Sequence, residues 1–200
     1  MTARTQILAA VRAALVAPPV VPAVPDIERS LPDGVEVIEL LIDRLHDYRA
    51  IVVERRGAIV EDIEHALRAR GIEQAVVAPD LPSDLRPTGI TCIEDADFDA
   101  RTLDGFAASI TTAAVAVAQT GTIILTHGPG QGRRALSLVP DVHVCVLQRA
   151  DVVGTLPEAL ARIGAPRLST WISGPSATSD IELQRVEGVH GPRTLIVVLT

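Results

Sequence analysis

The sequence predicts an α/β fold, with a mainly parallel sheet, helices on both faces and one β-hairpin. Short apolar, β-branched runs alternate with stretches whose apolar residues recur at helical spacing, which is typical of parallel strands joined by helices. Two β-like runs, at 113–118 and 122–127, are separated by only three residues, which favours a hairpin. The chain has 200 residues and is 48% hydrophobic, so it can bury one sizeable aliphatic core.

Residues 1–25 are predicted to form an N-terminal arm, and residues 26–200 a single α/β domain. Apolar residues at helical spacing predict an amphipathic surface helix at the start of the arm: Ile7, Leu8, Val11 and Leu15. The proline-rich stretch 18–25 cannot continue that helix and favours an extended, stiff conformation. The arm is therefore expected to pack on the main body or to reach away from it.

The domain is expected to begin with a helix within 34–48 and a buried strand at 50–54. A helix around 59–67, closed by Gly71, precedes the next strand. Thr155 and Glu158 form a T-x-x-E capping box that starts a helix over 155–163. The remaining predicted strands are 74–78, 89–94, 141–148, 169–173 and 193–200.

Composition excludes several classes of function. A net charge of −7 and only 2% aromatic residues argue against nucleic acid as a partner. All 18 basic residues are arginine, so no lysine is present for a Schiff base or a P-loop. Cys92 and Cys145 are fewer than the four thiolates an iron–sulfur cluster usually needs, and they are expected to be buried free thiols in a cytoplasmic protein. No apolar stretch reaches about 18 residues, so no membrane span is expected.

The histidines do not predict a metal site. His143 and Cys145 alternate on one strand, but no third ligand lies nearby, so zinc is not expected. His127 and His190 each precede Gly-Pro, which places them at loop edges where either could act as an acid or a base. We therefore expect no metal and no cofactor in this chain.

A glycine-rich loop is the first candidate binding element. It follows a strand and precedes a short apolar segment, ALSLV, which is expected to be helical. Glycines allow close approach of the backbone to a ligand, and arginines suit a phosphate or carboxylate. A tight turn with exposed arginines is the alternative. The candidate ligand-binding residues are Gly128, Gly130, Gln131, Gly132, Arg133 and Arg134.

A serine-rich loop after the run 169–173 is the second candidate. Ser179 and Glu182 fit a capping box for a following helix, which accounts for part of the segment without a ligand. The candidate ligand-binding residues here are Ser173, Gly174, Ser176 and Asp180. We expect the two loops to converge on one cleft at the carboxyl ends of the strands and to bind a small anion there. Arg133 is expected to be exposed, so that its removal leaves folding intact.

Four ordered motifs give the C-terminal half a specific resemblance. They are Ala118–Thr122, Gly128–Ala135 with Leu138–Pro140, Ile172–Ser176 with Asp180–Glu182, and Gly188–Pro192. Together they resemble the LUD-domain family of lactate-utilisation proteins. The resemblance implies a sheet of the type shared by glucosamine-phosphate deaminases, ribose-phosphate isomerases and CoA transferases. It also implies a role in a multi-protein system that oxidises L-lactate to pyruvate, in which iron–sulfur partner proteins do the redox work.

One position departs from the family pattern, which usually reads Glu-Thr-Gly-Thr. Here Gln119 stands first. In the CoA transferases of the wider fold a glutamate acts as the nucleophile, and if this position were used in that way, an amide could not replace the carboxylate. Gln119 and His190 are the candidate catalytic residues, but an accessory, non-catalytic subunit is favoured. The alternatives are an enzyme acting on a CoA thioester or a sugar phosphate, and an interaction module whose loops are only structural.

Overall fold

The computed structural model describes residues 2–15, 31–55, 57–178, 186–187 and 191–200. Its main sheet has six strands in the order β1-β12-β7-β4-β2-β3, and every neighbouring pair is parallel. The strands are β1 (Ile51–Glu54), β2 (Gln74–Val77), β3 (Thr91–Glu94), β4 (Ala108–Thr112), β7 (Val142–Leu147) and β12 (Thr194–Leu199). This arrangement confirms the predicted mainly parallel sheet.

A second sheet of four strands has the order β8-β5-β6-β9. Its strands are β5 (Val115–Val117), β6 (Thr122–Leu125), β8 (Val152–Val153) and β9 (Thr170–Ile172). Strands β5 and β6 are antiparallel, as the predicted hairpin requires, and β9 is antiparallel to β6. A separate two-stranded pair joins β10 (Ala177–Thr178) to β11 (Val186–Glu187).

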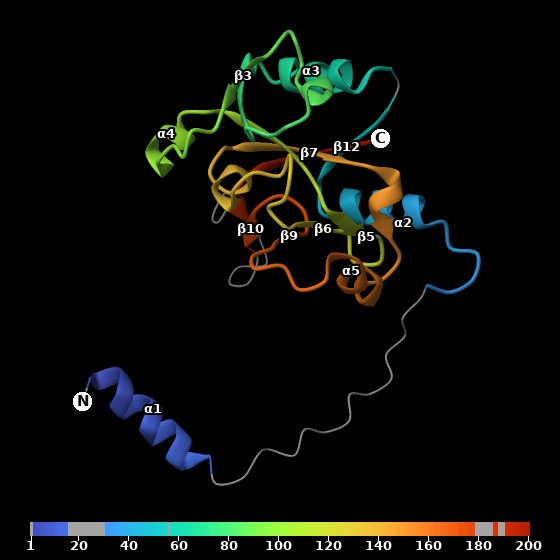
Figure 1. Ribbon diagram of the computed structural model, residues 1–200. Helices are drawn as coiled ribbons and strands as arrows, with labels where there is room; N and C mark the ends of the chain where they lie inside the picture. Colours follow the sequence, from blue (N-terminus) through green and yellow to red (C-terminus); the bar gives the residue numbers. More distant parts are fainter. Residues whose placement is uncertain (1, 16–30, 56, 179–185, 188–190) are drawn as a thin grey trace.

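Helices and the second sheet cover the main sheet in layers (Figure 1). One face packs against α3 (Ile59–Arg68) and Leu103 of α4 (Ala100–Asp104). The opposite face packs against α2 (Val37–Asp47) and against the inner face of the second sheet. Helix α5 (Leu156–Ile163) covers the outer face of the second sheet, so the hydrophobic core consists of three stacked aliphatic layers.

The same two chain segments are paired in both sheets. Strand β4 pairs with β7 in the main sheet, and β5 pairs with β8 in the second, again in parallel. The Ala113 amide donates to the Val146 carbonyl at 3.1 Å, which extends the first ladder, and the Ala118 amide donates to the Val153 carbonyl at 2.9 Å, which extends the second. The two segments therefore form one parallel ribbon that bends from one sheet into the other.

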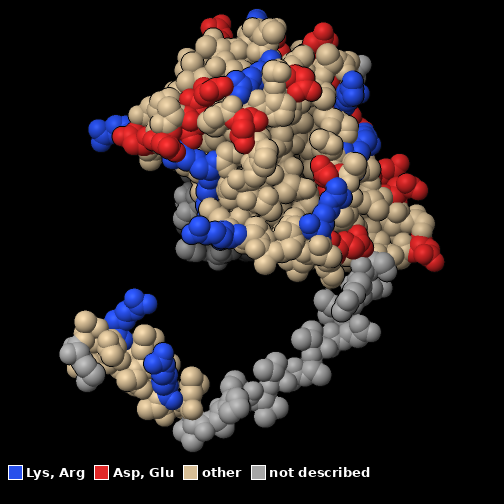
Figure 2. Space-filling model, viewed as in Figure 1, with Lys and Arg blue, Asp and Glu red and all other residues tan. Residues whose placement is uncertain are grey.

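The predicted N-terminal helix is present as α1 (Ala3–Ala14), and none of its residues is buried. Its large apolar residues Ile7 (63%), Leu8 (43%) and Val11 (52%) are exposed, and so is Leu15 (64%) at its C-cap. Arg4 and Arg12 are its only charged residues, and Figure 2 shows basic side chains and no acidic ones on the visible face of this helix. Among the described residues, no helix is long and apolar enough to cross a membrane.

Some elements differ from the sequence predictions. The apolar segment after the glycine-rich loop forms a four-residue 3-10 helix, η2 (Arg134–Ser137), instead of an α-helix. Strand β4 and helix α4 were not predicted, and two further 3-10 turns occur at η1 (Ser83–Leu85) and η3 (Arg149–Asp151). The helix expected after Ser179 lies outside the described residues.

Candidate functional site

The glycine-rich loop lies against the carboxyl ends of β4 and β2. The Thr112 amide donates to the Gly130 carbonyl at 2.9 Å, and the Thr112 hydroxyl donates to the Pro129 carbonyl at 3.3 Å. Gly132 has a φ of +63°, and a Cβ there would lie 3.2 Å from Cβ of Ala78. Positive φ and close packing both require glycine at this point. Gly128, Gly130 and Gly132 thus shape a backbone loop over the edge of the main sheet.

Gln131 holds this loop closed from inside. Its Oε1 atom accepts from the Thr126 amide at 2.6 Å and from the Thr126 hydroxyl at 3.4 Å, and the residue is only 7% exposed. No hydrogen bond of its Nε2 group is found among the residues that the structure describes. The Oε1 atom of the Gln131 side chain therefore holds the loop, while its Nε2 group is the donor that has no partner among the described residues.

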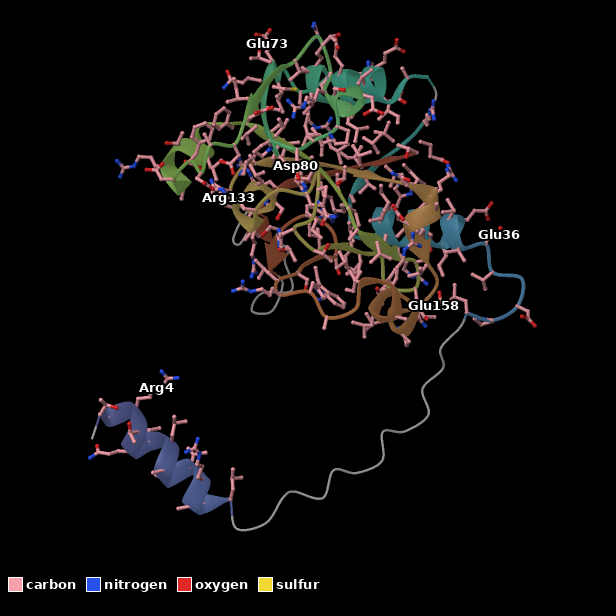
Figure 3. All side chains as sticks on the ribbon, viewed as in Figure 1. Arg4, Glu36, Glu73, Asp80, Arg133 and Glu158 are labelled. Atoms are coloured by element: carbon pink, nitrogen blue, oxygen red, sulfur yellow. The ribbon has the colours of Figure 1, made fainter. Side chains whose placement is uncertain are left out.

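Arg133 is an anchor of the loop. Its Nε donates to Oδ2 of Asp95 at 2.5 Å, and its Nη2 donates to Oδ1 of Asp95 at 2.9 Å and to the Phe98 carbonyl at 2.5 Å. The Asp95 side chain is only 4% exposed, and its hydrogen bonds with Arg133 lower the pKa of its carboxyl. Figure 3 shows Arg133 beside α4. Arg133 is therefore half-buried and ion-paired, contrary to the expectation that it is exposed.

His127 is also engaged in the loop. It has a positive φ of 59°, and its Nδ1 lies 2.9 Å from the Gly132 carbonyl. Because a carbonyl oxygen only accepts, Nδ1 donates to Gly132, and the other ring nitrogen, Nε2, lies 2.9 Å from the Thr170 hydroxyl oxygen. His127 thus ties the glycine-rich loop to the start of β9.

The serine-rich loop leaves β9 at its other end. Ser173 Oγ lies 2.9 Å from Thr122 Oγ1, which in turn lies 2.8 Å from Thr120 Oγ1, so three hydroxyls form a chain beside the hairpin turn. Gly174 has a φ of +80°, and a Cβ there would lie 2.4 Å from Cβ of Tyr48. The Tyr48 side chain and the positive φ therefore require glycine at this turn.

The two loops are arranged differently from the expectation. Because β6 and β9 are antiparallel, the glycine-rich loop and the serine-rich loop leave opposite ends of this strand pair. The two loops therefore do not begin at one shared edge formed by the carboxyl ends of the strands. The chain nevertheless brings Arg134, at the end of the first loop, to the second loop.

Arg134 and the serine-rich loop line one cavity of about 490 Å³, which we call the serine-loop pocket. It contains three of the predicted residues of the second loop, Ser173, Gly174 and Ser176. The other residues along it are Ser137, Leu138, Ser169, Thr170, Trp171, Ile172, Pro175, Gly191 and Pro192. Arg134 is the one charged residue in this described lining.

A larger cavity of about 710 Å³ lies at the carboxyl edge of the main sheet, and we call it the carboxyl-edge pocket. Of the predicted residues it contains Gln131. Its charges are mixed, because Arg55 and Arg149 line it together with Asp84 and Asp151. Sequence reasoning missed these four, although Arg55 and Arg149 lie just after predicted strands, where parallel sheets place their binding residues.

The remaining candidates are placed as follows. Gln119 is exposed at the hairpin turn, and its backbone amide donates to the Gly154 carbonyl at 3.1 Å. It lines neither of the two pockets. Asp180 and His190 lie outside the described residues.

His143 and Cys145 are buried on the face of β7 that meets the second sheet. His143 Nε2 lies 2.8 Å from Thr111 Oγ1, and burial lowers the pKa of His143 to about 4. Burial raises the pKa of the Cys145 thiol to about 12. Within the described part of the chain, no group of three or more histidine, cysteine or acidic side chains is arranged to hold a metal ion.

Known proteins resemble this chain over most of its length. Residues 42–200 match the family model for the LUD domain. Lactate utilization protein C of Deinococcus radiodurans is 41% identical over 174 residues, which cover 82% of this chain and 79% of that protein. Lactate utilization protein C of a Geobacillus species is 34% identical over 99 residues, which cover 44% of this chain and 41% of that protein.

A solved structure agrees with these sequence matches. The crystal structure of a DUF162 family protein from Deinococcus radiodurans has a TM-score of 0.71 and 34% sequence identity to this chain. The similarity covers 82% of this chain and 95% of that one. The parallel sheet, the four motifs and these matches all lead to one assignment: the chain belongs to the LUD domain family.

Proposed function

We propose that this protein is an accessory subunit of an L-lactate oxidation system and binds a small anionic ligand in the serine-loop pocket. The accessory role is supported by the 41% identity to a lactate utilization protein C over most of both chains. In this proposal, iron–sulfur partner proteins carry the electrons. The two cysteines of the sequence are fewer than the four thiolates that such a cluster usually needs.

The choice of pocket rests on charge. Arg134 lines the serine-loop pocket, and its guanidinium has no hydrogen-bond partner among the described residues, unlike that of Arg133. The same pocket is lined by serine hydroxyls, two buried prolines and two half-buried glycines, so a guest carboxylate or phosphate would meet one cation and several donors. The carboxyl-edge pocket has two acidic residues for its two basic ones and offers no such excess of positive charge.

Deletion of the gene in its host tests the accessory role. The deletion strain is expected to grow on glucose and to lose growth on L-lactate as sole carbon source, and the intact gene is expected to restore it. Unchanged growth on L-lactate would contradict the proposal. Purification of the tagged chain from lactate-grown cells tests the partners, because iron measured in the co-purified fraction should exceed that of the chain expressed alone.

Titration of the purified chain with L-lactate, pyruvate and inorganic phosphate tests the pocket. Trp171 is the single tryptophan, lines the pocket and is 43% exposed, so its fluorescence should respond to binding. Arg134→Ala should weaken binding by about tenfold, the loss expected for one charge-assisted contact. Arg101→Ala, an exposed arginine on α4, is the matched control. Binding that survives Arg134→Ala but is lost in Gln131→Ala would assign the ligand to the carboxyl-edge pocket and refute this choice.

A further inference from the structure

The carboxyl-edge pocket combines apolar and charged groups that the proposed function does not use. Part of its lining is apolar and includes the buried Leu85 and Val146 and the half-buried Ile59. Four charged side chains from three separate segments of the chain line it as well. Its volume of about 710 Å³ lies within the range of about 300–1,000 Å³ that is usual for pockets of small organic ligands. The pocket can therefore hold an organic molecule and contact both its apolar and its charged groups.

Two of these four charged side chains are paired with residues outside the pocket. Nη2 of Arg149 donates to Oε2 of Glu54 at 2.8 Å, and Asp151 forms an ion pair with Arg162. Neither Glu54 nor Arg162 lines the cavity. These two pairs account for one positive and one negative charge of the lining.

The other two, Arg55 and Asp84, carry opposite charges that are not paired. Arg55 directly follows β1, and its Nε donates to the Gly57 carbonyl at 3.0 Å. Within the described ranges its Nη1 and Nη2 groups have no hydrogen-bond partner, and the Asp84 carboxylate, on η1, has neither a hydrogen bond nor an ion pair. Asp84 would repel a simple anion in this cavity, and Arg55 would repel a simple cation. A guest that carries one charge of each sign would satisfy both residues.

Gln131 adds a hydrogen-bond donor to the same cavity. The residue is 7% exposed, and its Oε1 accepts from Thr126, which leaves Nε2 without a partner in the described part of the chain. Among the residues that the structure describes, Oγ of Ser109 is the only fully enclosed side-chain nitrogen or oxygen that lacks a partner, so open space lies beside Nε2. The cavity that Gln131 lines supplies that space. A Cβ at Gly128 would lie 3.6 Å from Nε2, so glycine there leaves room beside the donor.

We infer that the carboxyl-edge pocket binds a zwitterion of the α-amino-acid class with a large apolar side chain. Arg55 holds the carboxylate, because a guanidinium forms charge-assisted, bidentate hydrogen bonds with such a group. The Nε2 group of Gln131 donates to the same carboxylate, and Asp84 accepts from the ammonium group. The apolar side chain packs against Ile59 and Leu85. This site is separate from the serine-loop pocket, and the inference does not rest on the function proposed for that pocket.

Isothermal titration calorimetry of the full chain with L-phenylalanine and two analogues tests the need for both charges. Hydrocinnamate is the same molecule without the ammonium group, and phenethylamine is the same molecule without the carboxylate. L-phenylalanine is expected to bind, and each analogue should bind about tenfold more weakly or worse, the loss expected for one charge-assisted contact. Absence of L-phenylalanine binding would overturn the inference, and so would an analogue that binds equally well.

Paired substitutions assign each charge of the ligand to its residue. Asp84→Asn should weaken L-phenylalanine binding about tenfold and should not weaken hydrocinnamate, which has no ammonium group. Arg55→Gln should weaken both carboxylates and should not weaken phenethylamine. Asp80→Asn and Arg101→Gln are the matched controls, because both positions are exposed and lie outside the pocket lining. An Asp84→Asn variant that weakens both carboxylates equally would contradict the assignment.

Two further variants locate the site. Gln131→Glu keeps the acceptor for Thr126 and removes the Nε2 donor, so it should weaken L-phenylalanine and hydrocinnamate. Arg134→Ala alters the serine-loop pocket alone and should leave L-phenylalanine binding unchanged. Loss of L-phenylalanine binding in Arg134→Ala, with retention in Arg55→Gln and Asp84→Asn, would place the amino acid in the serine-loop pocket and overturn the inference.

Discussion

Replacing Arg133 with alanine should destabilise the fold, because it leaves the Asp95 carboxylate without its cation. The change removes the hydrogen bonds to both Asp95 oxygens and the one to the Phe98 carbonyl. Breaking a fully buried ion pair from one side costs about 3–5 kcal/mol. Here the Asp95 side chain is 4% exposed and that of Arg133 is 36% exposed, so water can reach part of the vacated site. Asp95 also keeps the Phe98 amide as a donor, at 3.1 Å.

Because water reaches part of the site and Asp95 keeps one donor, the expected loss of unfolding free energy is about 2–3 kcal/mol. For a chain of this size, that corresponds to a fall in melting temperature of roughly 4–12 °C. Urea denaturation followed by circular dichroism measures the free energy directly. Arg134→Ala is the matched control in the adjacent position, and it should change stability by less than about 0.5 kcal/mol.

The acid dependence provides a second measurement on the same pair. In the folded state the pKa of Asp95 is lowered from its ordinary value of 3.8, chiefly by the Arg133 hydrogen bonds. The stabilisation is therefore present above the unfolded pKa and is lost as the pH falls through the folded value. The difference between Arg133→Ala and wild type should be complete near neutral pH and shrink below about pH 4. A variant within about 0.5 kcal/mol of wild type at pH 7 would refute the reasoning.

Two buried or constrained residues and one loop residue give further predictions. Burial lowers the pKa of His143 to about 4. The unfolding free energy measured with urea should therefore fall between pH 6.5 and 4, by on the order of 1 kcal/mol per pH unit, because the unfolded chain takes up the proton. A flat pH profile would contradict this. Gly174→Ala should clash with Tyr48 and shift tryptophan emission, whereas Gly164→Ala, at a φ of +64° with nothing within 4 Å, should not. Gln131→Ala should cost about 1–2 kcal/mol in urea denaturation by orphaning a loop amide, and Gln131→Glu, which keeps an acceptor, should cost less.

The predictable part of the fold is the part with strong periodicity. Runs such as 74–78 and 141–148 have few polar residues and clear boundaries, so their strands were predicted to within a few residues. Strand β4 was missed because its sequence, ASITT, continues into β5 with only Ala113 and Ala114 between them. Nothing in that run marks the point where the chain changes sheets.

The site was less predictable because its contacts join distant segments. Arg133 and Asp95 are 38 residues apart, and no local pattern indicates that one is the partner of the other. The same holds for His127 and Thr170. The loop glycines were identified because positive φ is a local property, but the antiparallel β6–β9 pairing that separates the two loops is a tertiary feature.

The ribbon of β4 with β7 and β5 with β8 has a consequence for how the protein folds. Once β4 (residues 108–112) aligns beside residues 142–146 of β7, only a few residues of chain separate β4 from β5 and β7 from β8. Closing the second ladder then costs little additional loop entropy. The two sheets should consequently behave as one cooperative unit, with neither able to open while the other keeps its register. The bend at Ala113 and Ala114 therefore makes two layers of structure share a single unfolding transition.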